Sequence, residues 1–162
     1  MSGSAIVQRV VDVPAGAVWD VLADGWLYAN WVVGASRIRE VAPDWPQPGS
    51  RIHHSVGAWP ALIDDSTSVL AMTPGQELVL QARAWPAGEA VVRIGLEPRG
   101  DGQTVISMAE DVVGGPGRIV PQPVRQLLIV PRNREALTRL SLLAAGRVGE
   151  SPGALRRGRE VR

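Results

Sequence analysis

The sequence contains no cysteine, no lysine and no phenylalanine, and only two of its 162 residues are histidines. The absence of cysteine excludes disulfides, thiolate nucleophiles and cysteine-ligated metal sites. With two histidines, a zinc site would need carboxylates to complete it, so we expect no metal and no other cofactor. Because lysine and phenylalanine codons are rich in A and T, the use of arginine at all 17 basic positions indicates a GC-rich genome rather than phosphate recognition.

The sequence also lacks an excess of charge and a long apolar run. Its 17 basic residues nearly balance 16 acidic ones, and a net charge of +1 is too small for an electrostatic nucleic-acid binder. No stretch approaches the roughly 20 apolar residues that span a bilayer, and residues 1–13 lack the basic and apolar segments of a signal peptide. We therefore expect a cytoplasmic protein that has no membrane span and does not bind nucleic acid.

β-Branched residues dominate positions 5–13, which predicts a first strand that ends at Pro14. Pro14 is well suited to open a helix, because its missing N–H is not needed in the first turn. Apolar residues then recur at helical spacing within residues 15–23, and residues 26–31 indicate a second short helix. The first strand is therefore followed by two short helices.

Further strands are predicted along the middle of the chain, separated by short turns rich in proline and glycine. A parallel connection needs about a dozen residues or more, so these turns predict antiparallel hairpins and a meander. A segment of mixed polarity at residues 35–41 precedes five clearer strands. These cover residues 50–56, 62–72, 77–84, 90–96 and 104–111.

A long helix is predicted after the meander, over residues 132–147. Its apolar stripe at helical spacing consists of Ala136, Leu137, Leu140, Leu143 and Ala144. Residues 124–130 indicate a shorter helix that Pro131 ends or kinks. Gly146 and Gly149 mark the predicted end of the long helix.

These elements predict one α+β domain over residues 1–147, followed by an arginine-rich tail at 148–162 that we expect to be disordered. A long amphipathic helix after a meander must bury its stripe, and the concave face of the sheet is the available partner. The predicted architecture is a curved antiparallel sheet of about six to seven strands around the long C-terminal helix, with two short helices after the first strand. Since a twisted sheet curves away from a straight helix, we expect a cavity between them.

Three segments of the sequence resemble the START-like superfamily, also called the SRPBCC or polyketide cyclase/dehydrase and lipid-transport family. They are VPAGAVWDVLAD at residues 13–24, YANWVVG at 28–34 and RNREALTRL at 132–140, the last being similar to a bacterial subgroup of unknown function. The resemblance spans roughly residues 5–147 and implies a helix-grip fold with a ligand pocket. It implies no catalytic residue, because lipid carriers, hormone receptors and aromatase/cyclases of this superfamily share no catalytic motif.

Two titratable residues are candidates for catalysis, His54 and Glu110. Strand alternation sends His53 and His54 to opposite faces, and the sequence leaves open which of the two faces the cavity. An imidazole there can act as an acid or base, whereas the structural alternative, which we favour, is a buried histidine bonded to a neighbour. Glu110 follows the inward positions of its strand, where it is either an acid of raised pKa or the partner of an arginine.

We expect the ligand to contact apolar and aromatic side chains from the second helix, the strands and the long helix. Tyr28 can also supply a hydroxyl group. Trp45, Trp59 and Trp85 each precede a proline in a turn, and they form either an aromatic rim or ordinary turn packing. The predicted ligand-binding residues are Trp26, Tyr28, Trp31, His54, Trp59, Ile106, Met108, Leu137 and Leu140.

The leading functional hypothesis is a binding protein, rather than an enzyme, for a small hydrophobic or aromatic molecule such as a lipid or polyketide. Such pockets usually have volumes of roughly 300–1,000 Å³. The second hypothesis is a polyketide cyclase or dehydratase that uses His54 as acid or base, helped by Tyr28 or Glu110. The third is a protein-interaction or regulatory module that uses the outer face of the sheet or the arginine tail. A homodimer is compatible with all three.

Overall fold

Seven antiparallel strands form a single sheet with the order β1-β7-β6-β5-β4-β3-β2. The computed structural model describes residues 4–84 and 88–150 of the chain. Consecutive strands from β2 to β7 are neighbours, as the predicted meander requires, and β1 joins the far edge by pairing with β7. The strands are β1 (Ile6–Val11), β2 (Ala35–Val41), β3 (Arg51–Val56), β4 (Ile63–Thr73), β5 (Glu77–Ala84), β6 (Gly88–Arg99) and β7 (Gln103–Gly114).

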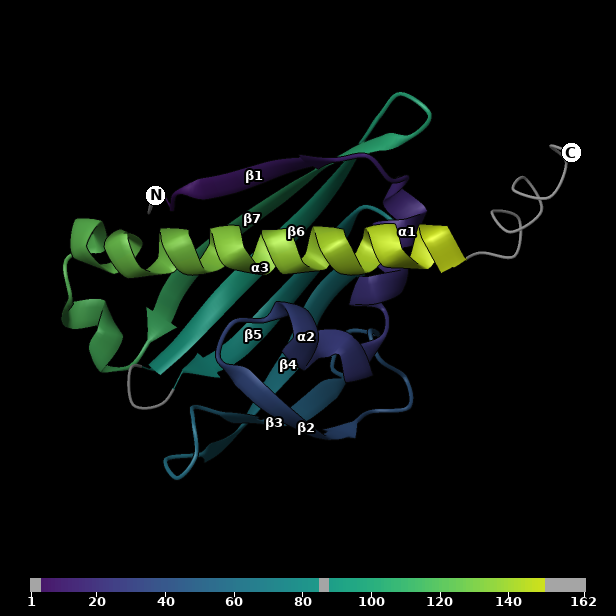
Figure 1. Cartoon of the computed structure of the whole chain (residues 1–162). Helices are drawn as coiled ribbons and strands as arrows, with labels where there is room; N and C mark the ends of the chain where they lie inside the picture. Colours follow the sequence, from purple (N-terminus) through teal and green to yellow (C-terminus); the bar gives the residue numbers. More distant parts are fainter. Residues whose placement is uncertain (1–3, 85–87, 151–162) are drawn as a thin grey trace, which may run out of the picture.

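The helices lie on one side of the sheet, with the longest crossing it (Figure 1). Two short helices and a 3₁₀ turn follow β1, and the Asp24 carboxylate accepts a hydrogen bond from the Trp26 amide at 3.1 Å where that turn begins. The helical elements are α1 (Ala15–Leu22), η1 (Gly25–Leu27), α2 (Tyr28–Trp31), η2 (Pro116–Ile119) and α3 (Gln122–Glu150). This arrangement confirms the predicted α+β helix-grip fold. No helix in residues 4–84 and 88–150 is both long and apolar enough to cross a membrane.

Helix α3 is longer than predicted at both ends. It begins at Gln122 and continues through Pro131, so the separate helix predicted for residues 124–130 is part of it. Pro131 is exposed, and water can therefore satisfy the carbonyl group that has lost its helical partner. Gly146 and Gly149 do not end the helix either, because an interior glycine only weakens a helix by roughly 1 kcal/mol. The predicted tail is helical up to residue 150, and its remainder lies outside the described residues.

The hydrophobic core lies between the sheet and the second half of α3. Leu137, Leu140 and Ala144 are fully buried and form the predicted stripe together with Ala136. Helix α1 packs against this part of α3 and contributes buried side chains of its own. Tight packing is thus confined to the part of the sheet beneath the second half of α3. The first half of α3 contacts fewer buried side chains.

The buried stripe of α3 supports a stability prediction. Leu140→Ala removes three carbon atoms from a fully buried site, so we expect the free energy of unfolding to fall by about 2–5 kcal/mol. Leu142→Ala, on the exposed side of the same helix, is the matched control and should change it by less than about 0.5 kcal/mol. Urea unfolding followed by circular dichroism measures both, and equal losses would contradict this placement of the core.

Candidate functional site

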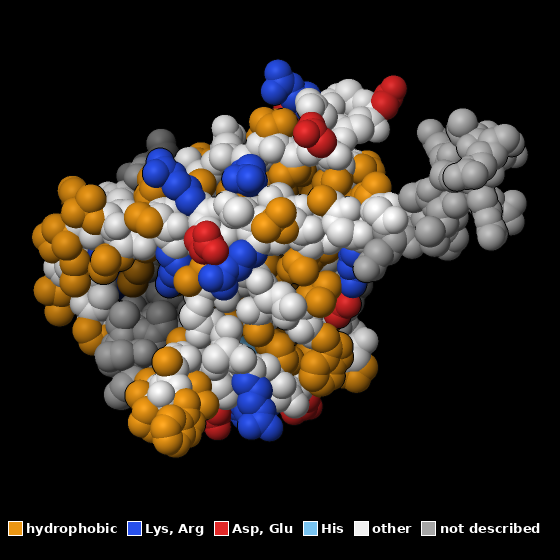
Figure 2. Space-filling model, viewed as in Figure 1, with side chains coloured by type: hydrophobic (Ala, Val, Ile, Leu, Met, Phe, Trp, Pro, Cys, Tyr) orange, Lys and Arg blue, Asp and Glu red, His pale blue; other side chains and the backbone are white. Residues whose placement is uncertain are grey.

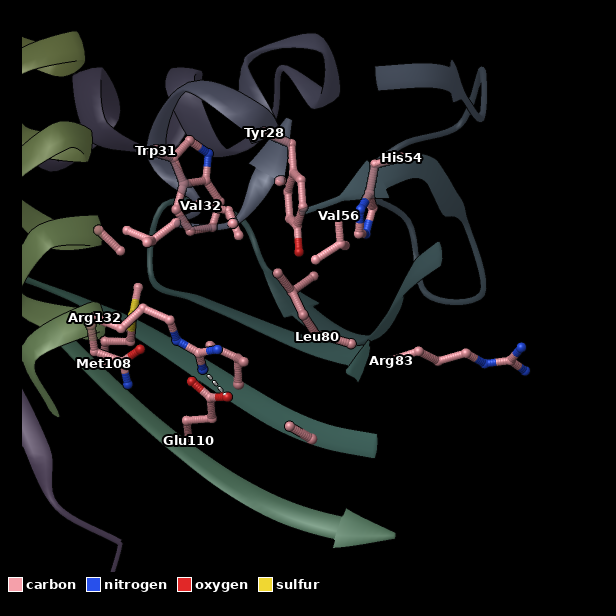
Figure 3. Close-up of a pocket in the computed structure, with 18 residues that line it drawn as sticks. Tyr28, Trp31, Val32, His54, Val56, Leu80, Arg83, Met108, Glu110 and Arg132 are labelled. Carbon is pink, nitrogen blue, oxygen red and sulfur yellow. Dashed lines mark hydrogen bonds and ion pairs between the residues drawn. The ribbon is translucent and has the colours of Figure 1, made fainter. Parts of the chain in front are cut away.

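A mostly apolar cavity of about 120 Å³ lies between α2, the sheet and the first half of α3. Figure 3 shows Tyr28, Trp31 and His54 on one side of it, with Met108, Glu110 and Arg132 on the opposite side. The volume is smaller than the predicted 300–1,000 Å³, because several large side chains project into the space between helix and sheet. The complete wall consists of Tyr28, Trp31, Val32, Val33, Gly34, Ala35, His54, Val56, Leu80, Ala82, Arg83, Ala90, Val92, Met108, Glu110, Arg132, Asn133 and Ala136.

A chain of buried hydrogen bonds supports one wall of the cavity. The Tyr28 hydroxyl lies 2.8 Å from the Thr67 Oγ1 atom, which lies 3.0 Å from the His54 Nε2 atom. All three side chains are buried, and the Tyr28 and His54 rings have centroids 5.3 Å apart. Tyr28 also meets Trp31 edge to face at 5.4 Å, which orients both rings of α2. The wall is therefore held rigidly by groups that mostly satisfy one another.

Burial shifts the pKa values of both ionisable members of this chain. Desolvation raises the pKa of Tyr28 to about 12, so its hydroxyl remains protonated at neutral pH. Desolvation lowers the pKa of His54 below 6.5, although the Asp65 carboxylate and the Ser55 backbone act in the opposite direction. His54 is consequently a neutral imidazole at neutral pH, with one ring nitrogen engaged by Thr67.

Glu110 and Arg132 form an ion pair at the opposite wall (Figure 3). Glu110 lies near the end of β7 and is buried, while Arg132 comes from α3 and is about 40% exposed. Of the two predictions for Glu110, the structure shows the arginine partner. A buried carboxylate needs such a partner, because an unpaired charge inside a protein costs several kcal/mol.

Asn133 and His54 are the two residues of the cavity wall that have a buried polar atom without a hydrogen-bond partner, and for His54 this atom is Nδ1. The Asn133 side chain is only 3% exposed, and its Nδ2 atom is buried without a hydrogen-bond partner. A buried amide donor without a partner costs about 1–3 kcal/mol. The Nδ2 atom is itself shielded from the cavity, so the Asn133 side chain would have to turn for this amide to donate a hydrogen bond to a molecule there.

A second, outer cavity of about 230 Å³ adjoins the first. Ala90, Glu110 and Arg132 line both, so the ion pair stands at the boundary between them. The outer cavity is otherwise bounded by η2 and the first turns of α3. Within residues 4–84 and 88–150, no three acidic or histidine side chains gather closely enough to hold a metal ion.

The structure brings together only some of the predicted ligand-binding residues. Tyr28, Trp31, His54 and Met108 line the inner cavity, and His54 rather than His53 is the histidine that faces it. Three further predicted residues are fully buried in the core beside the cavity and do not line it, because α1 and the second half of α3 pack tightly there. These are Ile106, Leu137 and Leu140.

The remaining predicted tryptophans lie away from this cavity. Trp26 is 60% exposed and borders a separate surface depression, and Trp59 is 85% exposed in the loop between β3 and β4. Trp45 is buried, where its Nε1 atom donates to the Leu22 carbonyl at 3.1 Å. Of the two alternatives for these tryptophans, Trp45 shows turn packing, Trp59 does not line the cavity, and Trp85 lies outside the described residues.

Sequence reasoning missed Arg132 and Asn133, although the sequence contains a signal for the second. Asn133 precedes Ala136, Leu137 and Leu140 by three, four and seven positions, so it lies on the apolar stripe of α3. A polar residue on an otherwise apolar stripe indicates either a buried partner or a site. Arg132 has no comparable signal, because arginines occur throughout this chain.

Comparison with known proteins identifies a family for most of the chain. The family model for Activator of Hsp90 ATPase homolog 1-like protein matches residues 12–121, from the end of β1 to just before α3. A comparison with curated proteins finds no match.

Solved structures with low sequence identity share the fold. Protein NE0264 from Nitrosomonas europaea has a TM-score of 0.66 and 18% identity, over 90% of this chain and 96% of that one. The ZhuI aromatase/cyclase from Streptomyces sp. R1128 has a TM-score of 0.69 and 15% identity, over 91% and 96%. Ara h 8.0201 has a TM-score of 0.65 and 12% identity, over 88% and 97%. The chain therefore belongs to the Activator of Hsp90 ATPase homolog 1-like protein family, within the START-like superfamily that its sequence resembles.

Proposed function

We propose that this protein binds a small apolar molecule, about the size of one aromatic ring, in the inner cavity. The observation that carries the proposal is the mostly apolar cavity of about 120 Å³ with the unpartnered Asn133 amide in its wall. An apolar cavity of about 150 Å³ in another protein holds benzene, so the volume suits a single ring. The inner cavity alone is too small for a lipid or an extended polyketide.

The polar groups of the cavity indicate the chemistry of the ligand. Thr67 joins Tyr28 and His54 by hydrogen bonds that leave the His54 Nδ1 atom free, and Glu110 is paired with Arg132. The Nδ2 atom of Asn133 is a donor that a ligand carbonyl oxygen would satisfy. A flat ring that carries one ketone or aldehyde group therefore fits both the volume and the polarity.

A larger ligand requires the two cavities to join. Arg132 is partly exposed and has a long flexible side chain, so it can rotate away from Glu110. A lipid or polyketide would need this movement, since Glu110 and Arg132 stand at the boundary between the cavities. We therefore rank the one-ring ligand first among hydrophobic molecules.

Ligand binding also ranks above a role as an interaction module. A contact with another protein needs no internal cavity, and a filled core would have favoured such a module. The family description refers to activation of the Hsp90 ATPase, an activity that likewise requires only a surface. Neither an interaction module nor an activator of another protein explains why this chain has an internal cavity.

Catalysis by His54 is the second candidate function. His54 faces the cavity as a neutral imidazole, the form that accepts a proton, and the fold is shared with an aromatase/cyclase. Against this role, the Nε2 atom of His54 is bonded to Thr67. A structural role for His54 fits this hydrogen bond better.

The proposal predicts selectivity for a carbonyl group. Acetophenone should bind more tightly than ethylbenzene, which has nearly the same shape and no acceptor, by about tenfold. Asn133→Ala should abolish this difference while ethylbenzene still binds, because the amide donor is lost and the smaller side chain can only enlarge the cavity. Isothermal titration calorimetry with both compounds measures the ratio.

A variant that fills the cavity serves as the control. Ala136→Leu places a larger side chain in the wall and should weaken the binding of both compounds. Leu142→Ala changes an exposed residue and should weaken the binding of neither. Failure of the unmodified protein to bind either compound would refute the proposed ligand class. Persistence of the carbonyl preference in Asn133→Ala would refute the role of Asn133.

Replacement of His54 separates the two candidate functions. His54→Ala removes the hydrogen bond to Thr67 and leaves space in a buried wall, so we expect the free energy of unfolding to fall by about 1–3 kcal/mol. A catalytic histidine predicts instead that turnover of a polyketide-like thioester is lost while the melting temperature stays nearly unchanged. Differential scanning calorimetry beside a product assay distinguishes these results.

The lowered pKa of His54 predicts how stability depends on pH. Below pH 6.5 the histidine of the unfolded chain binds a proton that the folded protein binds only at lower pH. The unfolded state is then favoured, so the free energy of unfolding should decrease as pH falls, by at most about 1.4 kcal/mol per pH unit from this group. His54→Gln should flatten the curve just below pH 6.5. Urea titrations across this range test the difference.

A further inference from the structure

Apolar side chains project into solvent from η2 and the first turns of α3. Ile119 is 86% exposed, Leu127 74% and Leu128 77%. Figure 2 shows hydrophobic atoms gathered at this end of α3. We call this surface the η2–α3 patch, and it consists of Ile119, Val120, Val124, Leu127 and Leu128.

No part of the described chain covers the outer side of this patch. Ile129 is buried and Val130 packs against the core, so they occupy the inner side of α3, while Leu127 and Leu128 face outward. A surface helix of a soluble domain normally carries polar residues on its outer side. A helix that is apolar on all sides is normally covered on all sides, and the outer side of these turns has no cover within the described chain.

The segment that carries the patch has charges of one sign, although Glu89 and Glu110 lie beside it at the outer cavity and Glu110 is paired with Arg132. Residues 112–134 contain four arginines and no acidic residue, although the whole chain is almost neutral. Arg118 and Arg125 lie within the patch segment itself. A symmetric contact between two copies would bring these arginines close to one another, which disfavours a second copy as the partner. A negatively charged surface is complementary.

The shape of the patch favours a lipid surface over a peptide. A helical or extended peptide is usually received by a groove or a sheet edge, whereas these side chains protrude from a convex end of the molecule. Protruding apolar residues flanked by arginines are typical of elements that lie in a membrane interface. The loop between β3 and β4 projects nearby, since Ile63 and Pro116 line one depression, and it carries the exposed Trp59. Tryptophan is enriched at membrane interfaces.

We propose that the η2–α3 patch docks onto an anionic lipid surface, with Ile119, Leu127 and Leu128 among the acyl chains and the arginines at the phosphate groups. The docked protein would not span the membrane. Val120 and Leu128 also line the outer cavity, so docking turns that cavity toward the lipid. An apolar ligand could then pass between the lipid and the protein without crossing water.

Vesicle flotation tests the proposal with the full chain. Vesicles of phosphatidylglycerol and phosphatidylcholine in equal parts should bind the protein, and vesicles of phosphatidylcholine alone should bind it more weakly. The double variant Leu127→Ser/Leu128→Ser should lower the partition coefficient about a hundredfold, or about tenfold for each leucine withdrawn from the acyl region. Leu142→Ser, equally exposed on a later turn of α3, is the matched control and should bind as the unmodified protein does.

Three results would overturn this proposal. The first is no flotation of the unmodified protein with the anionic vesicles. The second is an equal loss of vesicle binding in Leu142→Ser and in the double variant. The third is a dimer of the unmodified protein in analytical ultracentrifugation that the double variant converts to a monomer, since a second copy would then cover the patch. Because Leu127 and Leu128 are exposed, the melting temperature of the double variant should remain unchanged, which separates lost docking from lost folding.

Discussion

The burial of the apolar stripe of α3 against the sheet and α1 is the contact on which the rest of the structure depends. The stripe runs through Leu137, Leu140 and Ala144, and all three are fully buried. Toward the beginning of α3 the stripe is interrupted at Asn133 before it resumes at Ile129 and Val130, and α1 no longer fills the space beneath the helix. The helix cannot bend down to close this gap without losing its contacts further along. The cavity is thus a direct consequence of a straight helix that is anchored at one end of a curved sheet.

The polar residues of the cavity wall leave two atoms without a hydrogen-bond partner, the Nδ2 atom of Asn133 and the Nδ1 atom of His54. Tyr28, Thr67 and His54 form one hydrogen-bonded set on the side of α2 and β3, and Glu110 and Arg132 form another between β7 and α3. Each set offsets part of the desolvation of its own members. Asn133 lies between apolar neighbours on α3 and belongs to neither set. Selectivity for one ligand group requires this kind of imbalance, because a fully satisfied wall would recognise shape alone.

The fold was predictable from the sequence because its signals are local. Alternating residues in the strands and the spacing of Leu137 and Leu140 define which side of each element is buried, and the short turns leave only antiparallel neighbours. The extent of α3 was not predictable, because the effect of Pro131 depends on whether the carbonyl it leaves free reaches water. The cavity wall was partly predictable. Ile106 and Met108 share a face of β7, and only the packing of α1 decides that one is core and the other lines the cavity.

The pairing of β1 with β7 has a consequence for how the chain folds during synthesis. Val7 pairs with Met108 and Val11 with Thr104, so β1 leaves the ribosome about a hundred residues before its partner strand. The meander from β2 to β7 can assemble from neighbouring hairpins, whereas β1 must close a long loop. Helix α3, which covers the assembled sheet, is made later still. Strand β1 of a growing chain therefore stays without its native neighbour until β7 has been made, and until then it is an unpaired strand edge exposed to other chains.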